Sequence, residues 1–345
     1  MPISLPPVGT ELNTNHPSRR RFLAGSLAAA AGLLLPAGRL PVLWGADAAN
    51  APPSVDPDRF ALLSDIHIAG DRKRVYRGVN MFDNLQRVCA QVTARRPAAV
   101  FIDGDLAHLS GKAEDYATVV ESLTPLRRAG LPLLLTLGNH DRHDRFWSAL
   151  PDEDAARKDP RNRPIRQAQS RPTSQAQPKP FRQAQDWPVE GRQAMAFETP
   201  RANFFLLDSL SPGSPTSGLV GDAQLKWLAS ALDRSPGKPA LVMVHHNPDR
   251  GLIVTGLRDT AALMKVIVPR KQVKALFFGH THSWSITRQE GLHLVNLPPV
   301  AYVFWTGKPN GWVEASLRDN GMTLQLHCLD KKNKLNENVT NLDWR

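Results

Sequence analysis

Five short polar clusters in this sequence have residue types that could carry out chemistry. They are Asp65-Ile66-His67, Gly104-Asp105, Gly138-Asn139-His140-Asp141, His245-His246 and Gly279-His280-Thr281-His282. Carboxylate, amide and imidazole groups together bind first-row divalent metal ions, and one shared carboxylate can bridge two ions about 3.5 to 4 Å apart. Two such ions lower the pKa of a bound water, so that hydroxide is available near neutral pH, and they hold phosphate oxygens during a displacement. The residue types therefore predict a two-metal site that activates water.

The elements that would position these clusters alternate between strand and helix. Apolar runs predict strands at 59–64, 98–102, 131–137, 203–207, 240–244 and 273–278. Apolar residues at helical spacing predict helices at 79–92, 116–126 and 225–232. This alternation is typical of an α/β sheet with helices on its faces. Each cluster follows one of the strands, and ligands gather beyond the carboxyl ends of strands in such sheets, so we expect the clusters to meet at one rim.

The last part of the chain, residues 298–345, has a different pattern. Residues 312–319 and 322–329 are predicted strands on either side of Asn320-Gly321, a dipeptide that favours a two-residue hairpin turn. We therefore expect a C-terminal β-hairpin followed by a tail.

Residues 155–190 interrupt the alternation with a low-complexity segment. The sequence Arg-Gln-Ala-Gln occurs at 166–169 and again at 182–185 among several prolines, and apolar residues are few. Such a composition buries too little apolar surface to offset the entropy lost on ordering, so we expect a mobile surface loop and not a binding domain. Because the segment begins soon after the cluster at 138–141, it could shape access to the site.

The first 48 residues have the charge and hydropathy pattern of an export signal. The run Ser18-Arg19-Arg20-Arg21-Phe22-Leu23-Ala24 precedes an apolar stretch that ends near Leu35, and Ala46-Asp47-Ala48 provides small residues for cleavage. The pattern resembles a bacterial twin-arginine signal peptide at 1–48. It implies a mature chain at 49–345, passage through the twin-arginine translocase, and a periplasmic or extracellular location. The apolar stretch is shorter than the ~18 residues of a spanning helix, so no stable membrane span is expected in the mature form.

The clusters taken together resemble a known family. The ordered set D-x-H, GD, GNHD, HH and GHTH, spread over residues 59 to about 297, is similar to the motifs of the calcineurin-like metallophosphoesterase superfamily. Residues 221–228, Gly-Asp-Ala-Gln-Leu-Lys-Trp-Leu, further resemble the bacterial branch that acts on cyclic nucleotides and glycerophosphodiesters. The resemblance implies two mixed β-sheets packed face to face and flanked by helices, with a metal site at the carboxyl rim of the strands. It also implies a hydrolase that attacks phosphodiesters or phosphomonoesters with metal-activated hydroxide.

The same resemblance implies a role for each matching residue. Three side chains would bind the first ion, three the second, and one carboxylate would bridge them: Asp65, His67 and His282; Asn139, His245 and His280; and Asp105. His140 would protonate the leaving oxygen as a general acid, and Asp141 would orient His140. Nitrogen and oxygen ligands of this mixture suit iron, manganese, zinc or cobalt alike, as divalent or trivalent ions.

Two further histidines have open roles. We prefer His245 to His246 as the ligand, because the strand at 240–244 leads directly into His245; His246 could line the pocket. His108 stands where purple acid phosphatases have a metal-binding tyrosine, so a tyrosinate-bound ferric site is disfavoured. His108 could itself be a ligand, support the ligands, or lie at the pocket rim.

The formal net charge of +11 does not by itself indicate a nucleic-acid partner. Residues 1–48 account for +2 and residues 155–192 for +6, which leaves +3 for the rest of the chain. Nucleic acid normally requires a clustered basic surface on the fold itself, so the expected partner is a small phosphate ester. Two alternative functions remain open. One is an exported nuclease, and the other is a non-catalytic scaffold of the same fold; the intact ligand set disfavours the scaffold.

Overall fold

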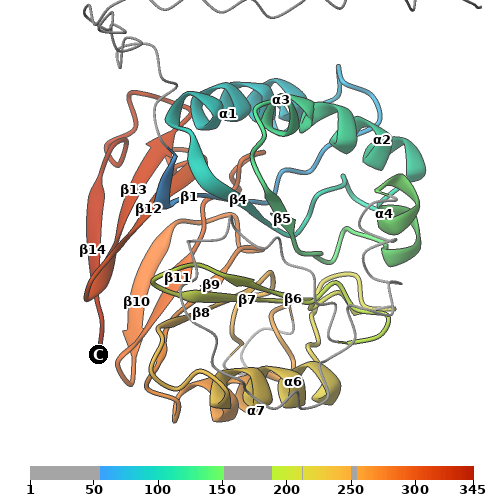
Figure 1. Cartoon of the computed structure of the whole chain (residues 1–345). Helices are drawn as coiled ribbons and strands as arrows, with labels where there is room; N and C mark the ends of the chain where they lie inside the picture. The colour runs from blue at the N-terminus through green and yellow to red at the C-terminus, as the bar shows by residue number, and fades with distance from the viewer. Residues whose placement is uncertain (1–54, 151–188, 212, 250–254) are drawn as a thin grey trace, which may run out of the picture. The chain divides into compact units, whose positions relative to one another are not determined.

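Two six-stranded β-sheets form the framework of the chain in a computed structural model (Figure 1). The structure describes residues 55–150, 189–211, 213–249 and 255–345. The predicted signal peptide at 1–48 and most of the predicted insertion at 155–190 lie outside the described residues. Everything described belongs to one unit, Pro53–Arg345.

The first sheet has the strand order β14-β13-β12-β1-β4-β5. Its strands in chain order are β1 (Asp56–Ser64), β4 (Pro97–Asp103), β5 (Leu133–Leu135), β12 (Gly311–Arg318), β13 (Gly321–Cys328) and β14 (Val339–Asp343). Strands β1, β4 and β5 are parallel, and β12, β13 and β14 continue the sheet from β1 in antiparallel pairs. Strand β4 is buried along its whole length, as expected for a parallel strand that is covered on both faces.

The second sheet has the strand order β10-β11-β9-β8-β7-β6. Its strands in chain order are β6 (Met195–Glu198), β7 (Asn203–Leu207), β8 (Ala240–Val244), β9 (Val273–Phe278), β10 (Ser285–Gln289) and β11 (Leu292–Asn296). The central strands β7, β8, β9 and β11 are parallel, and the two edge strands are antiparallel to their neighbours. Both sheets are therefore mixed.

The two sheets pack face to face through a core that is rich in aromatic rings. Phe204 of β7 contacts Phe60 of β1 and Phe101 of β4, with ring centroids 5.0 and 4.7 Å apart. Apolar residues of both sheets continue this buried cluster. Aromatic pairs at such separations stabilise a core beyond the area that they bury. The predicted α/β sandwich of two mixed sheets is confirmed.

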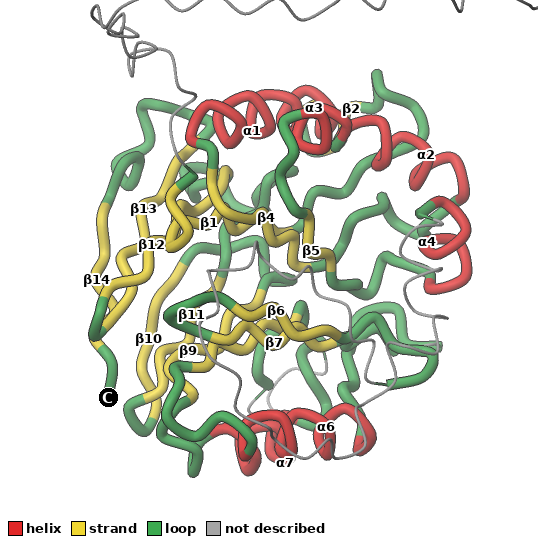
Figure 2. Tube along the Cα trace, viewed as in Figure 1, coloured by secondary structure: helices red, strands yellow, loops and turns green. Residues whose placement is uncertain are grey.

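Helices cover the outer face of each sheet (Figures 1 and 2). The helices on the first sheet are α1 (Met81–Arg95), α2 (Ala113–Ser122), α3 (Thr124–Arg128) and α4 (His143–Ala149), and those on the second are α6 (Asp222–Asp233) and α7 (Thr260–Ile267). The side-chain oxygen of Asn80 caps α1 by accepting a hydrogen bond from the N–H of Asp83 at 3.1 Å. Among the described residues, none of these helices is both long and apolar enough to span a bilayer.

A short two-stranded ribbon, β2 (Val75–Tyr76) and β3 (Val79–Asn80), precedes α1. Arg77 and Gly78 form its turn, and both have positive φ angles, 49° and 78°. Two-residue hairpin turns with positive φ at both positions match the twist of the strands that they join. Val79 therefore belongs to this ribbon and not to the helix predicted at 79–92.

Several predicted elements differ in detail. The strand expected at 131–137 is shortened to β5, and the expected C-terminal tail contains the strand β14, which pairs with β13. The helix expected at 116–126 is divided at Leu123 into α2 and α3. Pro125 follows the division and has no N–H to continue the backbone ladder, which accounts for the break. The C-terminal hairpin is present, but Arg318 pairs with Gly321, so its turn is Asp319-Asn320 and not Asn320-Gly321.

Candidate active site

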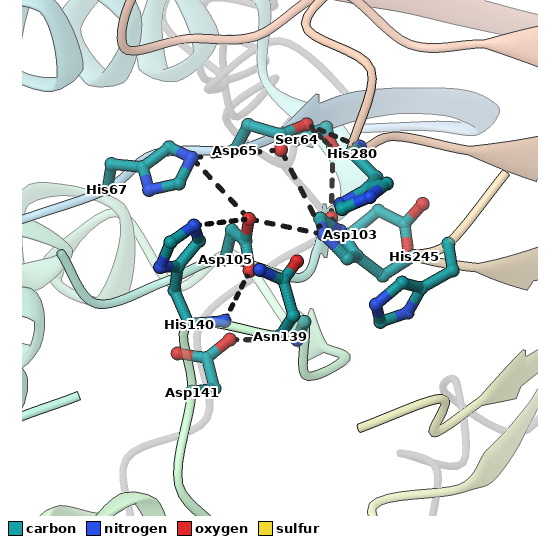
Figure 3. Close-up of polar contacts among 12 residues, drawn as sticks. Ser64, Asp65, His67, Asp103, Asp105, Asn139, His140, Asp141, His245 and His280 are labelled. Atoms are coloured by element: carbon teal, nitrogen blue, oxygen red, sulfur yellow. Dashed lines mark hydrogen bonds and ion pairs between the residues drawn. The ribbon is translucent and has the colours of Figure 1, made fainter. Parts of the chain in front are cut away.

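The five polar clusters meet at the carboxyl ends of β1, β4, β5, β8 and β9 (Figure 3). Several residues of the clusters have positive backbone φ angles: Asp65 (52°), His67 (46°), Asp105 (47°), His280 (67°) and His282 (51°). Residues other than glycine rarely adopt this conformation, and such strain is concentrated at functional sites. Gly138 meets a different requirement, because a Cβ atom at this position would collide with the carboxylate of Asp105.

The first group of candidate metal ligands is Asp65, His67 and His282. Oδ1 of Asp65 lies 3.4 Å from Nε2 of His282 and 3.8 Å from Nε2 of His67. The other carboxylate oxygen, Oδ2, is held at 2.5 Å by the hydroxyl of Ser64 and at 3.2 Å by the backbone N–H of His280. One oxygen of Asp65 is thus fixed by hydrogen bonds and the other faces the two imidazoles.

The second group is Asp105, His245 and His280. Oδ2 of Asp105 lies 3.3 Å from Nε2 of His245 and also 3.5 Å from Nε2 of His67, which belongs to the first group. Its Oδ1 accepts a hydrogen bond from the backbone N–H of His140 at 3.0 Å. One carboxylate oxygen therefore faces both groups, which is the arrangement that a bridging ligand requires.

Hydrogen bonds to backbone carbonyls orient two of the imidazoles. Nδ1–H of His245 donates to the carbonyl of Asp103 at 2.8 Å, and Nδ1–H of His282 donates to the carbonyl of Tyr302 at 2.6 Å. In each ring this leaves Nε2 directed at the carboxylates. Partners of this kind fix the tautomer and direction of metal-binding histidines.

The polar atoms of the site fit a pair of transition-metal ions. Within the described residues, Oδ1 of Asp65, Oδ1 of Asn139 and Nε2 of His245 are buried without a hydrogen-bond partner. Buried polar atoms almost always have partners, so three such atoms at one place need an explanation. Ligation by metal ions provides it, because carboxylate, amide and imidazole atoms are ligands of first-row metals. Asn139 donates through Nδ2 to the carbonyl of Pro215 at 2.9 Å, which directs its oxygen away from that contact.

The electrostatics of the site favour a bound cation. Burial alone would raise the pKa of Asp105, but His245, His140 and His67 together hold this pKa well below its ordinary value. Burial lowers the pKa of His245, but the carboxylates of Asp105, Asp65 and Asp103 together outweigh burial and raise that pKa to about 10. Burial lowers the pKa of His67 and brings that of His280 to about 4, so these two rings are neutral near pH 7 and able to ligate. The carboxylates that favour a charged ring at His245 equally favour a metal cation.

His140 points into the cleft from the loop after β5. Its Nδ1–H donates to the carbonyl of Leu109 at 2.5 Å, and its Nε2 lies 4.0 Å from Oδ2 of Asp105. His140 also forms a third possible ligand group with His67 and Asp105. The ring is therefore close enough to the centre to reach a substrate there, and its distance to Asp105 is longer than those of His67 and His245.

Asp141 contacts other groups than the expected one. Its carboxylate accepts hydrogen bonds from the backbone N–H groups of Leu106, Ala107 and Gly138 at 2.9 to 3.1 Å, and from the hydroxyl of Tyr116 at 3.0 Å. The expectation that this side chain orients His140 is corrected, because the carbonyl of Leu109 orients that ring. Asp141 instead joins the loop after β4 to the loop after β5.

The two histidines with open roles are buried beside the centre. His246 has its Nδ1 2.7 Å from the hydroxyl of Ser209, and its ring centroid lies 4.8 Å from that of His280. His108 is only 6% exposed, so it does not lie at the pocket rim. Its ring is 5.1 Å from that of Tyr76 and 6.4 Å from that of His67. Both therefore pack against ligand histidines.

A cleft of about 580 Å³ opens beside the metal groups. Its lining includes Asp105 and His280 together with three aromatic residues, Tyr302, Phe304 and Trp305. These aromatic residues have no counterpart among the five clusters. The available signal in the sequence is the run Tyr302-Val303-Phe304-Trp305, which lies between two predicted strands and not within one.

A two-sheet sandwich with paired Asp and His groups at its rim defines a dinuclear metallohydrolase of phosphate esters. The model of the calcineurin-like phosphoesterase family matches residues 58–284, and the chain belongs to this family. The matched region contains all five clusters. The protein is thus a metal-dependent phosphoric ester hydrolase, and its centre is suited to two transition-metal ions.

Individual relatives have names that refer to cyclic nucleotides. Over 236 residues, 65% of this chain and 71% of the relative, the chain is 28% identical to a probable cyclic nucleotide phosphodiesterase of Rhodopseudomonas palustris. Over 256 residues, 71% of this chain and 77% of the relative, it is 25% identical to the 3′,5′-cyclic adenosine monophosphate phosphodiesterase CpdA of Pseudomonas aeruginosa. A solved dimetal phosphatase from Danio rerio superposes with a TM-score of 0.58 at 17% identity, covering 84% of this chain and 100% of that one. This last likeness concerns the fold alone.

Proposed function

We propose that the chain hydrolyses small phosphodiesters, cyclic nucleotides among them, at this centre. The observation that carries the proposal is the position of Asp105, whose Oδ2 lies 3.5 Å from Nε2 of His67 and 3.3 Å from Nε2 of His245. A carboxylate so placed can bridge two ions, and two-ion centres stabilise both the attacking and the leaving oxygen of a displacement at phosphorus. The preference for diesters is supported by the relatives, which are phosphodiesterases by name.

The ligands fall into two sets that share one residue. In this proposal the first ion is held by one carboxylate and two imidazoles, the second by one amide and two imidazoles, with a bridging carboxylate between them: Asp65, His67 and His282; Asn139, His245 and His280; and Asp105. Two of the three ligand groups in the structure, Asp65 with His67 and His282 and Asp105 with His245 and His280, support this division. For Asn139 the support is its buried side-chain oxygen, which has no hydrogen-bond partner among the described residues.

The chain's own groups complete the chemistry. When bound, the two ions supply a water of lowered pKa and positive charge beside the phosphate. His140 holds the proton that the leaving oxygen takes up, and the hydrogen bond from Nδ1–H to Leu109 at 2.5 Å keeps its Nε2 directed toward the centre. Asp141 keeps the two loops on which Asp105 and His140 stand in register.

The proposal is tested by metal content and hydrolysis measured on the same preparations. Purified full chain should hold close to two transition-metal ions, hydrolyse bis(p-nitrophenyl) phosphate and 3′,5′-cyclic AMP faster than p-nitrophenyl phosphate, and lose activity on chelation. Asp105→Ala should lose metal and all activity together, whereas Asp144→Ala, exposed on α4, should keep both. Full activity without bound metal would refute the dinuclear centre, and a monoester rate above both diester rates would refute the diester preference.

We further infer that the chain is exported through the twin-arginine pathway to the periplasm or beyond. The support is the run Ser18–Ala24 with its three arginines, the apolar stretch that follows, and the small residues at 46–48. All of these lie outside the described residues.

A further inference from the structure

The cleft beside the metal centre continues onto an aromatic surface that the metal chemistry does not require. This surface consists of Tyr302, Phe304 and Trp305, which all line the cleft. Phe304 is 40% exposed and Trp305 is 61% exposed. Small-molecule sites are lined mainly by apolar and aromatic side chains with a few polar groups at fixed places. Two exposed rings inside the catalytic cleft therefore indicate a binding surface for part of the substrate.

The aromatic surface has a fixed position relative to the metal ligands. The carbonyl of Tyr302 accepts the Nδ1–H of His282 at 2.6 Å, and the ring of Phe304 stacks on His282 with centroids 4.4 Å apart. At the base of the same loop, the N–H of Ala301 donates to the carbonyl of Asp65 at 3.1 Å. Trp305 then stands edge to face against Phe304, with centroids 6.0 Å apart. A single ring thus separates the exposed indole from a metal ligand.

A cation lies over the same surface. The guanidinium of Arg77, at the turn of the β2–β3 ribbon, is 4.9 Å from the ring centroid of Phe304 and 6.0 Å from that of Tyr302. Guanidinium groups at this distance are attracted to aromatic faces, and they also donate hydrogen bonds to the acceptor atoms of nucleobases. The aromatic surface therefore has an open ring for stacking at Trp305 and a planar donor over the neighbouring ring of Phe304.

We propose that Trp305, supported by Phe304 and Arg77, binds the planar base of a nucleotide substrate while the phosphate of that substrate lies at the metal centre. The inference rests on the proposed hydrolysis of phosphodiesters and deepens it, because it selects esters that carry an aromatic base over esters of glycerol. Stacking of one base on one aromatic side chain changes affinity by roughly 5- to 150-fold. The indole is placed to set specificity, since neither the ions nor the general acid need it.

The test compares two esters that differ only in the base. These are 3′,5′-cyclic AMP and 1-O-methylribose 3′,5′-cyclic phosphate, each given to the metal-loaded full chain. The chain should have a lower KM for cyclic AMP, by roughly 5- to 150-fold. Trp305→Ala should remove most of this difference by raising the KM for cyclic AMP, with far less change for the base-free ester. Trp305→Phe should keep most of the difference, and Val339→Ala, which removes an apolar side chain that is 53% exposed on the edge strand β14, should keep all of it.

A binding measurement separates this inference from the proposed function. Calorimetric titration with adenosine 5′-monophosphate and with ribose 5-phosphate should show tighter binding of the nucleotide, and Trp305→Ala should abolish the difference. Equal KM values for the two esters in the unaltered chain, or equal losses on both in Trp305→Ala, would overturn the base site and leave diester hydrolysis standing. A chain that hydrolyses neither ester but binds the nucleotide through Trp305 would refute the proposed function and support the base site.

Discussion

Single residues at the centre use one polar atom for a hydrogen bond and leave the other for metal or substrate. Oδ2 of Asp65 accepts from Ser64 at 2.5 Å, while its Oδ1 faces the imidazoles. Nδ1 of His245 donates to the carbonyl of Asp103 at 2.8 Å, while its Nε2 faces Asp105. Because the partners are backbone carbonyls or a neighbouring hydroxyl, the ligand directions are set before any ion binds. Such preorganisation is what holds catalytic groups in productive geometry.

Replacing His140 by alanine separates its role as an acid from a role as a ligand. His140→Ala should keep both metal ions, because its Nε2 is farther from Asp105 than those of His67 and His245. The rate should fall roughly 10²- to 10⁴-fold for esters with alkoxide leaving groups, which need a proton. For nitrophenolate esters the loss should be smaller. Metal stoichiometry and rates on both ester types provide the measurement.

Two results would withdraw the assignment of His140. Loss of a metal ion in His140→Ala would make the ring a ligand, as its place in the third ligand group allows. An equal slowing of both ester types would show that no proton is delivered by it. His293→Ala, on β11, provides a control for removing an imidazole outside the ligand groups, because that ring contacts the backbone carbonyl of Asp343.

Asp141 is expected to act on stability more than on the chemical step. Asp141→Asn replaces one acceptor oxygen by an NH₂ group. At the Oδ2 position this group would face the backbone N–H donors of Gly138 and Leu106, and at the Oδ1 position it would face that of Ala107. Leaving such buried donors unsatisfied costs about 1–3 kcal/mol each, so unfolding by urea should occur at a clearly lower concentration. Asp144→Asn, on an exposed position of α4, should leave the midpoint unchanged. An unchanged midpoint in Asp141→Asn would mean that the two loops do not depend on this carboxylate.

The sequence predicted residue types and their convergence better than it predicted side-chain directions. Asp105 and His280 could be singled out because each follows an apolar strand, and parallel strands bring their carboxyl ends together. The partners of Asp141 could not be predicted, because the N–H groups of Leu106 and Ala107 and the hydroxyl of Tyr116 come from other segments of the chain. The aromatic surface at Phe304 and Trp305 was not predicted for a similar reason, since it is defined by contacts with His282 and with the distant β2–β3 ribbon.

Among the elements, buried parallel strands were the easiest to predict and edges the hardest. The strands at 203–207, 240–244 and 273–278 have the predicted bounds, because continuous apolar runs mark strands that are covered on both faces. The edge strands β6, β10 and β14 were missed, and β10 for example mixes half-buried and exposed residues and lacks an apolar run. One buried parallel strand, β11, was also missed, because His293 and Asn296 interrupt its short apolar run. Edge strands carry less burial and so a weaker pattern.

The C-terminal hairpin shows burial overriding turn preference. In the observed register Leu317 pairs with Met322, and both are buried in the core between the sheets. A turn centred on Asn320-Gly321 would instead place Met322 opposite Asp319. That register would leave the same side chains on each face, with Leu317 opposite Leu324, but it would bring Asp319 onto the buried face. The observed register keeps Asp319 in the turn, where its side chain is exposed.

Excising residues 160–185 should test whether the insertion matters to the elements on either side of it. The flanks are already joined, because Nε1 of Trp147 in α4 donates to Oε1 of Gln193 at 2.9 Å. Arg192 also donates to the carbonyl of Leu210 at 2.7 Å. With a short Gly-Ser bridge in place of the segment, the melting temperature should change by less than about 2 °C. A large fall would mean that the segment packs on the core, and an altered substrate preference alone would assign it to the cleft entrance.

At the scale of the whole molecule, the centre exists only where the two sheets meet. The first sheet contributes the loops after β1, β4 and β5, and the second contributes those after β8 and β9. His245 of the second sheet reaches Asp105 of the first at 3.3 Å, so each sheet alone holds an incomplete set of ligands. Metal binding is therefore coupled to the packing of the sandwich.

Removing the ions should lower the stability of the entire sandwich. An ion that binds only the folded chain stabilises it by about 2.7 kcal/mol when its free concentration is 100 times Kd. Loss of two such ions should lower the melting temperature by roughly 5–10 °C in a single cooperative transition. Calorimetry before and after chelation, followed by readdition of metal, is the measurement. A melting temperature that chelation leaves unchanged would show that the ligands are equally well held without ions.

If the ions bind before export, the chain must cross the membrane in its folded state, as the twin-arginine pathway allows. Because ligands from both sheets form the centre, only the folded chain can retain the ions, and the resemblance at 1–48 implies a pathway that moves folded proteins. Changing Arg19, Arg20 and Arg21 together to lysine keeps the charge but should block recognition, since the pathway reads arginine side chains. The precursor should then accumulate in the cytoplasm with close to two ions bound, and the periplasmic and extracellular fractions should lack the mature form.

Cell fractionation with elemental analysis of each fraction makes the measurement. The matched control changes Arg39 alone to lysine, because this residue lies after the apolar stretch. Unchanged export of the triple variant would reject the pathway, and a trapped precursor that is folded but free of metal would show that the ions are acquired only after export.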